Sequence, residues 1–180
     1  IMGRGNTYKL SRQRIFFISG LALLLGLSLI ESVRAGTLIE DTGISLTGVY
    51  QSSVVWGDID NDGDLDLALA GFDNKDERRS KIYENTGSPQ YNLAVLQDLT
   101  GVSNVSLAWG DYDRDGDLDL ALSGQTEAAP GRFTKIYRND DGVLTDSGIE
   151  LIPVWAGSLA WGDYDNDGDL DLGLTGWNNV

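Results

Sequence analysis

The 180-residue sequence contains no histidine, no cysteine and only 3 prolines. The lack of imidazole and thiol groups excludes histidine bases, cysteine nucleophiles, disulfides and the usual zinc ligands. Basic residues are also scarce, with 13 Lys and Arg against 28 Asp and Glu and a net charge of −15. Nucleic-acid binding depends on clustered Lys and Arg, so we expect no nucleic-acid partner and favour cations instead.

The first 35 residues have the order of an export signal. A basic start leads into an apolar run from Ile15 to Ile30, and Val33 and Ala35 then stand at the positions that signal peptidase prefers. The alternative is a membrane anchor, but the run of 16 residues is shorter than the roughly 20 needed to span a bilayer. We predict cleavage after Ala35 and a secreted or cell-surface location, extracellular or periplasmic, with membrane attachment only if the leader is retained.

The segment after the leader, residues 36–180, is strongly acidic and repetitive. It holds eight Lys and Arg against 27 Asp and Glu, a net charge of −19. Three Trp-Gly-Asp triplets begin at Trp56, Trp109 and Trp161, with spacings of 53 and 52 residues. A second element, Lys-Ile-Tyr-x-Asn, recurs at residues 81–85 and 135–139. Such a period is typical of repeat architectures, in which each unit is stabilised by its neighbours.

Each repeat is predicted to form four short antiparallel strands, because leucines alternate with polar or small residues after every acidic cluster. We expect hairpin turns at residues 61–63, 114–116 and 166–168. Period-two alternation predicts one buried face per strand, and a unit of this size matches a β-propeller blade. The fold class is therefore all-β, with about two and a half propeller blades in residues 36–180. A closed propeller needs roughly four to eight blades, so the sequence is expected to be a fragment of a larger propeller.

Three nine-residue loops, at residues 58–66, 111–119 and 163–171, share the pattern Asp-x-Asp-x-Asp-Gly-Asp-Leu-Asp. Calcium takes six to eight oxygen ligands, and carboxylates at positions 1, 3 and 5 of a tight loop converge on one point. Glycine at position 6 permits the sharp turn. We expect position 7 to supply its main-chain carbonyl and the aspartate at position 9 to close the ligand shell.

The loops have two alternative interpretations, an EF-hand and a metal-free turn. An EF-hand loop carries a bidentate Glu at position 12 and leads into a helix, whereas position 12 here is Leu69, Leu122 or Leu174 in an alternating strand. The second alternative is that the aspartates are solvated turn residues. However, five carboxylates in each loop repel one another strongly without a cation.

These repeats resemble the FG-GAP/VCBS family, the calcium-loop β-propeller repeats of integrin α-subunits and of many secreted bacterial proteins. The resemblance covers residues from about 37 to 180. The Phe-Gly and Gly-Ala-Pro signatures are absent, so the bacterial type is closer than the integrin type. The resemblance implies about one calcium ion per loop, three in the chain. It implies these metal ligands: Asp58, Asp60, Asp62, Asp64 and Asp66; Asp111, Asp113, Asp115, Asp117 and Asp119; Asp163, Asp165, Asp167, Asp169 and Asp171.

The aromatic and basic residues outside the loops have two interpretations each. The triplet tryptophans could stack on sugar rings, but their recurrence beside small residues favours a place in the blade core. Tyr83 and Tyr137 are likewise expected to pack. The segments 72–79 and 125–132 differ between repeats, which is where binding specificity would lie on a constant scaffold. A basic cluster in the first of these, formed by Lys75, Arg78, Arg79 and Lys81, is favoured as a solvated loop.

The preferred functional hypothesis is a secreted, non-catalytic calcium-binding module that mediates protein or carbohydrate interaction, including cell adhesion. The alternatives are the propeller portion of a secreted polysaccharide-active enzyme and a purely structural repeat array of a surface protein. Catalysis within this stretch is disfavoured, because a glycosidase needs two carboxylates in different environments and these aspartates repeat one metal pattern three times. We expect no enzymatic activity and no catalytic residue.

Overall fold

The computed structural model describes residues 14–15, 39–40, 44–87 and 92–178, and all regular structure within them is β-strand. The predicted leader, residues 1–35, lies outside these residues except at Arg14–Ile15, so its cleavage stays a prediction. Among the described residues there is no helix with the length and apolar character needed to cross a membrane.

Eleven strands are seen in the described residues. A short parallel pair joins β1 and β2, and all other pairings are antiparallel. The strands are β1 (Arg14–Ile15), β2 (Ile39–Glu40), β3 (Tyr50–Gly57), β4 (Asp66–Phe72), β5 (Arg78–Asn85), β6 (Leu93–Gly110), β7 (Asp119–Gln125), β8 (Phe133–Asp140), β9 (Val143–Asp146), β10 (Trp155–Gly162) and β11 (Asp171–Trp177).

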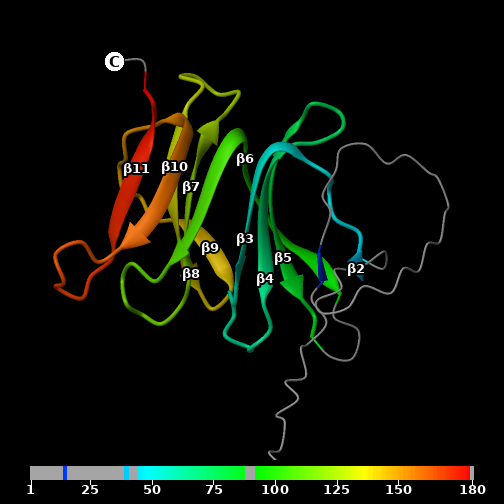
Figure 1. The fold of residues 1–180 in the computed structure, drawn as a ribbon, viewed down its shortest axis with the longest axis horizontal. Coiled ribbons are helices and arrows are strands. Elements are labelled where there is room, and N and C mark those ends of the chain that lie inside the picture. The colour runs from blue at the N-terminus through cyan, green and yellow to red at the C-terminus, as the bar shows by residue number, and fades with distance from the viewer. Residues whose placement is uncertain (1–13, 16–38, 41–43, 88–91, 179–180) are drawn as a thin grey trace, which may run out of the picture.

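The strands form four-stranded units in the order that the sequence predicts. The first unit is β3-β4-β5-β6, the second is β6-β7-β8-β9, and the third begins with the hairpin β10-β11. Strand β6 is 18 residues long and serves both complete units, since Leu93–Val102 pairs with β5 and Ser103–Gly110 pairs with β7. Figure 1 shows the three units side by side. The prediction of an all-β fold built from four-stranded antiparallel repeats is confirmed.

The units stack face to face, with a leucine face on one side and a small-residue face on the other. Ala68 and Ala70 of β4 pack in one cluster with Leu120 and Leu122 of β7. In the same way Ala121 of β7 packs with residues of β10 and β11. The sequence predicts one buried face per strand, but β4 and β7 are buried on both faces. The second face is covered because alanine lets the neighbouring sheet approach closely.

The tryptophans of the second and third triplets pack at these interfaces, whereas Trp56 of the first triplet is 42% exposed, so the expected core position is wrong for it. The indole of Trp109 lies on Gly57 of the preceding repeat, and the indole of Trp161 lies on Gly110. Trp161 also donates a hydrogen bond from Nε1 to the carbonyl of Ala108, at 3.2 Å. The structure therefore places both tryptophans at packing positions between repeats, which confirms a core role for them.

A methyl group at the glycine beneath the indole is expected to destabilise the stack. A Cβ built on Gly110 lies 2.6 Å from Cδ1 of Trp161, so Gly110→Ala should force the ring away and lower the free energy of unfolding by about 1–3 kcal/mol. Gly162→Ala is the matched control, because nothing lies within 4 Å of a Cβ at that position. Equal losses in the two variants, measured by urea denaturation, would contradict this packing.

Candidate metal centres

The three acidic loops connect β3 to β4, β6 to β7 and β10 to β11, and all lie at the lower ends of the sheets in Figure 1. Each loop contains two residues with left-handed backbone conformation, at positions 4 and 6. Asn61, Arg114 and Asn166 have φ near +60°, and the glycines at position 6 have φ of +91°, +101° and +93°. The predicted hairpin turns are thus confirmed, and the glycine is needed because other residues rarely adopt such angles.

In the first two loops the carboxylates at positions 1, 3 and 5 converge. One oxygen from each of Asp58, Asp60 and Asp62 lies within 4.8 Å of the other two, and the trio Asp111, Asp113 and Asp115 repeats this arrangement. Two oxygens that bind the same calcium ion, each at about 2.3–2.6 Å, are separated by at most about 5 Å. Both trios therefore have the spacing of ligands that share one cation.

The position 1 aspartate of each of these loops has one carboxylate oxygen that accepts a hydrogen bond and one that does not. Oδ2 of Asp58 accepts a hydrogen bond from the Gly63 amide at 3.0 Å, and Oδ2 of Asp111 accepts one from Gly116 at 3.1 Å. The other oxygen, Oδ1, is buried in both residues and has no hydrogen-bond partner. A buried carboxylate oxygen without a donor is costly, and a bound cation removes that cost.

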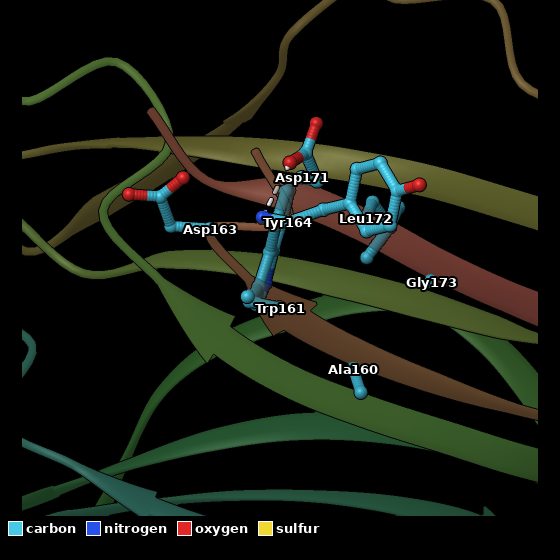
Figure 2. Close-up of a pocket in the computed structure, with 8 residues that line it drawn as sticks. Ala160, Trp161, Asp163, Tyr164, Asp171, Leu172 and Gly173 are labelled. Atoms are coloured by element: carbon cyan, nitrogen blue, oxygen red, sulfur yellow. Dashed lines mark hydrogen bonds between the residues drawn. The ribbon is translucent and has the colours of Figure 1, made fainter. Parts of the chain in front are cut away.

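The third loop is arranged differently. Its convergent trio is Asp163, Asp165 and Asp171, all exposed. Oδ1 of Asp163 accepts a hydrogen bond from the Asp167 amide at 3.2 Å, so the oxygen that is orphaned in the other loops has a partner here. Figure 2 shows Asp163 and Asp171 beside a shallow pocket lined by Tyr164 and Leu172.

The position 9 aspartates connect each loop to its sheet by accepting hydrogen bonds from backbone amides, and we call this connection the tie. Asp66 is buried and accepts hydrogen bonds from the amides of Ile59, at 2.8 Å, and Asn85, at 2.7 Å. Asp119 does the same with Tyr112 and Asn139. Burial raises the pKa of Asp66, and it raises the pKa of Asp119 to about 6, although the backbone hydrogen bonds act in the opposite direction.

Asp66 and Asp119 do not belong to the convergent trios of their loops, whereas Asp171 belongs to the trio of the third loop. Asp171 nevertheless makes the same tie, since its Oδ2 accepts a hydrogen bond from the Tyr164 amide at 2.8 Å (Figure 2). One carboxylate can therefore accept the loop amide and also belong to a convergent trio.

The aspartates at position 7 direct their side chains to groups outside the trios in the second and third loops. Asp117 accepts hydrogen bonds from the Asn61 side chain and the Asp141 amide, and Asp169 forms an ion pair with Arg114 at 2.6 Å. Asp167, at position 5 of the third loop, accepts a hydrogen bond from the Asp169 amide and is absent from the trio there.

Asn139 is a site residue that the sequence analysis did not single out. It is fully buried, and its Nδ2 donates to the carbonyls of Ile59, at 2.7 Å, and Leu118, at 3.2 Å. It thus contacts the first and second metal loops together. The recurrence of Asn at residues 85 and 139 was the available signal, but a contact 80 positions away in the sequence could not be read from it.

The structure also shows the environment of the two repeated tyrosines and of the basic cluster. Tyr83 and Tyr137 are buried, as expected. Members of the basic cluster pair with acidic residues: Arg78 with Glu127, Arg79 with Asp73 and Glu77, and Lys81 with Asp98. These pairs leave little net positive charge for an acidic ligand. Arg78, Arg79 and Lys81 lie in strand β5, and the side chains of Arg78 and Lys81 are only 16% and 17% exposed, so the expectation of a solvated loop is wrong for these three residues.

Comparison with known proteins supports the repeat assignment. A family model described as FG-GAP-like repeat matches residues 58–122, from the first aspartate of the first loop to three residues beyond the last aspartate of the second. Searches of curated proteins and of solved structures gave no match. Residues 58–122, with the first two acidic loops and the strands between them, are therefore similar to an FG-GAP-like repeat, which agrees with their four-stranded antiparallel construction.

Proposed function

We propose that the chain is a secreted calcium-binding module of β-propeller type that mediates protein or carbohydrate interaction and has no catalytic activity. The observation that carries the metal assignment is the pair of buried, partnerless oxygens, Oδ1 of Asp58 and Oδ1 of Asp111, each within a carboxylate trio. An FG-GAP-like repeat over the same residues supports it. The acidic charge of the chain and its predicted leader support an extracellular location, where calcium is available.

The chemistry of the donor set favours calcium over other metals. All candidate ligands are carboxylate or carbonyl oxygens, which suit hard cations, and the chain has no His or Cys for zinc or copper. The aspartates at positions 1, 3 and 5 would supply side-chain oxygens in the first two loops, and those at positions 1, 3 and 9 would supply them in the third. Position 7 would supply its carbonyl. Magnesium demands near-octahedral geometry and gives up water reluctantly, so it should replace calcium poorly.

Removal of one trio carboxylate should abolish one site. We expect Asp62→Asn and Asp115→Asn each to bind one calcium ion fewer than the unmodified chain in isothermal titration calorimetry. Glu150→Gln is the control, because it removes the same charge from an exposed position outside the loops. If the loop variants kept the full stoichiometry, the cation would lie elsewhere.

The recognition surface is proposed at the opposite ends of the hairpins. There the ring of Tyr50 stacks on Phe72 at 5.3 Å between centroids, and the guanidinium of Arg78 lies 4.7 Å from the centre of the Phe72 ring. The Tyr50 hydroxyl donates to Asp76 at 2.5 Å, which orders the neighbouring turn. Exposed aromatic faces beside polar groups are suited to both sugar rings and protein side chains.

The same register carries different residues in each repeat. Tyr50 opposes Phe72, Ser103 opposes Gln125, and Trp155 opposes Trp177. Trp177 is exposed, as is Tyr50. Variation at one structural position, beside invariant metal loops at the other end, is the arrangement expected of a scaffold with a variable binding surface.

A glycan array and a binding screen against extracellular-matrix proteins test this surface. Tyr50→Ala is expected to reduce any binding by about tenfold, as is typical when a central aromatic contact is lost. Tyr164→Ala, an exposed aromatic at the metal-loop end, should leave binding unchanged. Hydrolase and lyase assays on a polysaccharide panel should show no turnover, and turnover would favour the enzyme hypothesis instead.

A further inference from the structure

The first two acidic loops are each contacted by the repeat that follows them. Ile59, at position 2 of the first loop, is fully buried in a cluster with Leu120, Tyr137 and Leu144 of the second repeat. Tyr112, at position 2 of the second loop, stacks on Trp161 of the third repeat at 6.2 Å. Tyr164 occupies the same position in the third loop and is 89% exposed. The structure therefore anchors the first loop most deeply and the third least.

Polar side chains also connect consecutive loops, and we call these contacts the link. Position 4 of each loop reaches position 7 of the next: Nδ2 of Asn61 donates to Oδ1 of Asp117 at 2.7 Å, and Arg114 pairs with Asp169 at 2.6 Å. The same Asp117 accepts the amide of Asp141 through its other oxygen, at 3.0 Å. The loops thus form a chain of contacts along the lower edge of the sheets in Figure 1.

The buried part of the link is Asn139. Its Nδ2 holds the carbonyl of Ile59 in the first loop and that of Leu118 in the second, and its own amide donates to Asp119 at 2.9 Å. Its Oδ1 accepts the Gly142 amide at 2.9 Å, which fixes the β8–β9 turn. That turn packs against the first loop, since a Cβ on Gly142 would lie 3.3 Å from Cβ of Asp60.

We infer that the first two loops bind their cations as a coupled pair, with Asn139 as the positioning residue that links them. This inference rests on the proposed calcium function. A cation held by Asp111, Asp113 and Asp115 would order the second loop, whose Leu118 carbonyl accepts a hydrogen bond from Asn139. Through Asn139 it would also order the Ile59 carbonyl in the first loop. The first loop then loses less conformational freedom when it binds its own cation, so its affinity rises, and the reverse holds equally.

Asn85 provides a matched control. It occupies the same place in the first repeat and makes the same contacts within its repeat, from its amide to Asp66 at 2.7 Å and from Nδ2 to the Leu65 carbonyl at 3.2 Å. Among the described residues no preceding metal loop accepts a hydrogen bond from it. Asn85→Ala therefore removes the local role of this asparagine but leaves the link between the two loops intact.

Calcium titration calorimetry on the full chain measures the coupling. In a background with Asp165→Asn in the third loop, three proteins are compared: one with both loops, one with Asp115→Asn and one with Asp62→Asn. The coupling factor is the product of the two association constants of the two-loop protein, divided by the product of the single-loop constants. We expect a factor of at least about five, the lower end of typical coupling between sites.

Asn139→Ala should bring the coupling factor close to one, and Asn85→Ala should leave it unchanged. Asn61→Gly gives a second variant at an exposed position whose left-handed φ glycine readily adopts, and it should lower the factor with little effect on folding. Hydrogen exchange supplies an independent readout: in the Asp62→Asn protein, calcium at the second loop should slow exchange of the first-loop amides, unless Asn139 is also replaced.

The outcomes separate the two proposals. If the unmodified chain takes up no calcium, the proposed function fails and the coupling fails with it. If calcium binds to both loops with a coupling factor near one, or if Asn139→Ala and Asn61→Gly both leave the factor unchanged, the coupling is overturned while the calcium function stands.

Discussion

Calcium is expected to raise the melting temperature of the chain by about 5–11 °C for each loop that it occupies at a hundred times its dissociation constant. Binding to the folded state alone adds about 2.7 kcal/mol per site under that condition. For a chain of this size, 1 kcal/mol corresponds to about 2–4 °C. The physical source is the carboxylate trio of each loop, whose like charges face one another within 4.8 Å until a cation separates them.

Thermal melts followed by circular dichroism, in calcium, in magnesium and in a chelator, measure this effect. Magnesium should give a clearly smaller shift than calcium at the same concentration. The Glu150→Gln control should keep the full calcium shift, whereas Asp62→Asn and Asp115→Asn should each lose about one site's share. An unchanged melting temperature across the three conditions would show that no loop binds calcium in the folded state.

Leu120→Ala is expected to lower the free energy of unfolding by about 2–5 kcal/mol. Leu120 is fully buried in β7 and belongs to the cluster that joins the first two repeats. Truncation of a buried leucine loses its transfer free energy and leaves a cavity that the tightly packed sheets on both sides can fill only in part. Because Ile59 belongs to the same cluster, the loss should also loosen the first metal loop.

Leu172→Ala is the matched control for Leu120→Ala. Leu172 has the same position in β11 but is only partly buried and lines the shallow pocket shown in Figure 2. We expect its truncation to lower the free energy of unfolding by less than half as much. Chemical denaturation of both variants in calcium makes the comparison, and similar losses would mean that the stacking of the first two repeats does not dominate the core.

The parts of the fold that depend on local pattern could be predicted from the sequence. The repeat of the Trp-Gly-Asp triplet established the period, leucine alternation located β4 and β7, and the Asp-Gly clusters located the turns. Each of these signals arises within a few residues of the structure that it predicts. For the same reason the aspartates at positions 1, 3 and 5 of the first two loops were brought together as expected.

Features that depend on contact between repeats could not be predicted in this way. The burial of Ala68 and Ala121 requires a second sheet against the alanine face, and a single strand's pattern does not show whether that sheet is present. The two ties of Asp66 and the two-loop contact of Asn139 depend on how strands from different parts of the chain are placed. The third loop has the same aspartates as the others, yet its trio differs.

These differences separate the role of the loop aspartates from the role of the residues that the next repeat contributes. Under the proposed function, identical aspartate spacing would set which cation a loop can hold, and the residues contributed by the next repeat would set how firmly the loop keeps its binding conformation. Loops one and two share the buried, partnerless carboxylate oxygen and a buried or stacked position 2 side chain. Among the described residues the third loop lacks both features.

The most direct test of the account is the amount of calcium that the purified chain retains. The chain is equilibrated by dialysis against buffered calcium, and bound metal is measured by elemental analysis against protein concentration. The account predicts about three calcium ions per chain at saturation. Retention of no calcium above the buffer level, by a chain shown to be folded, would contradict it.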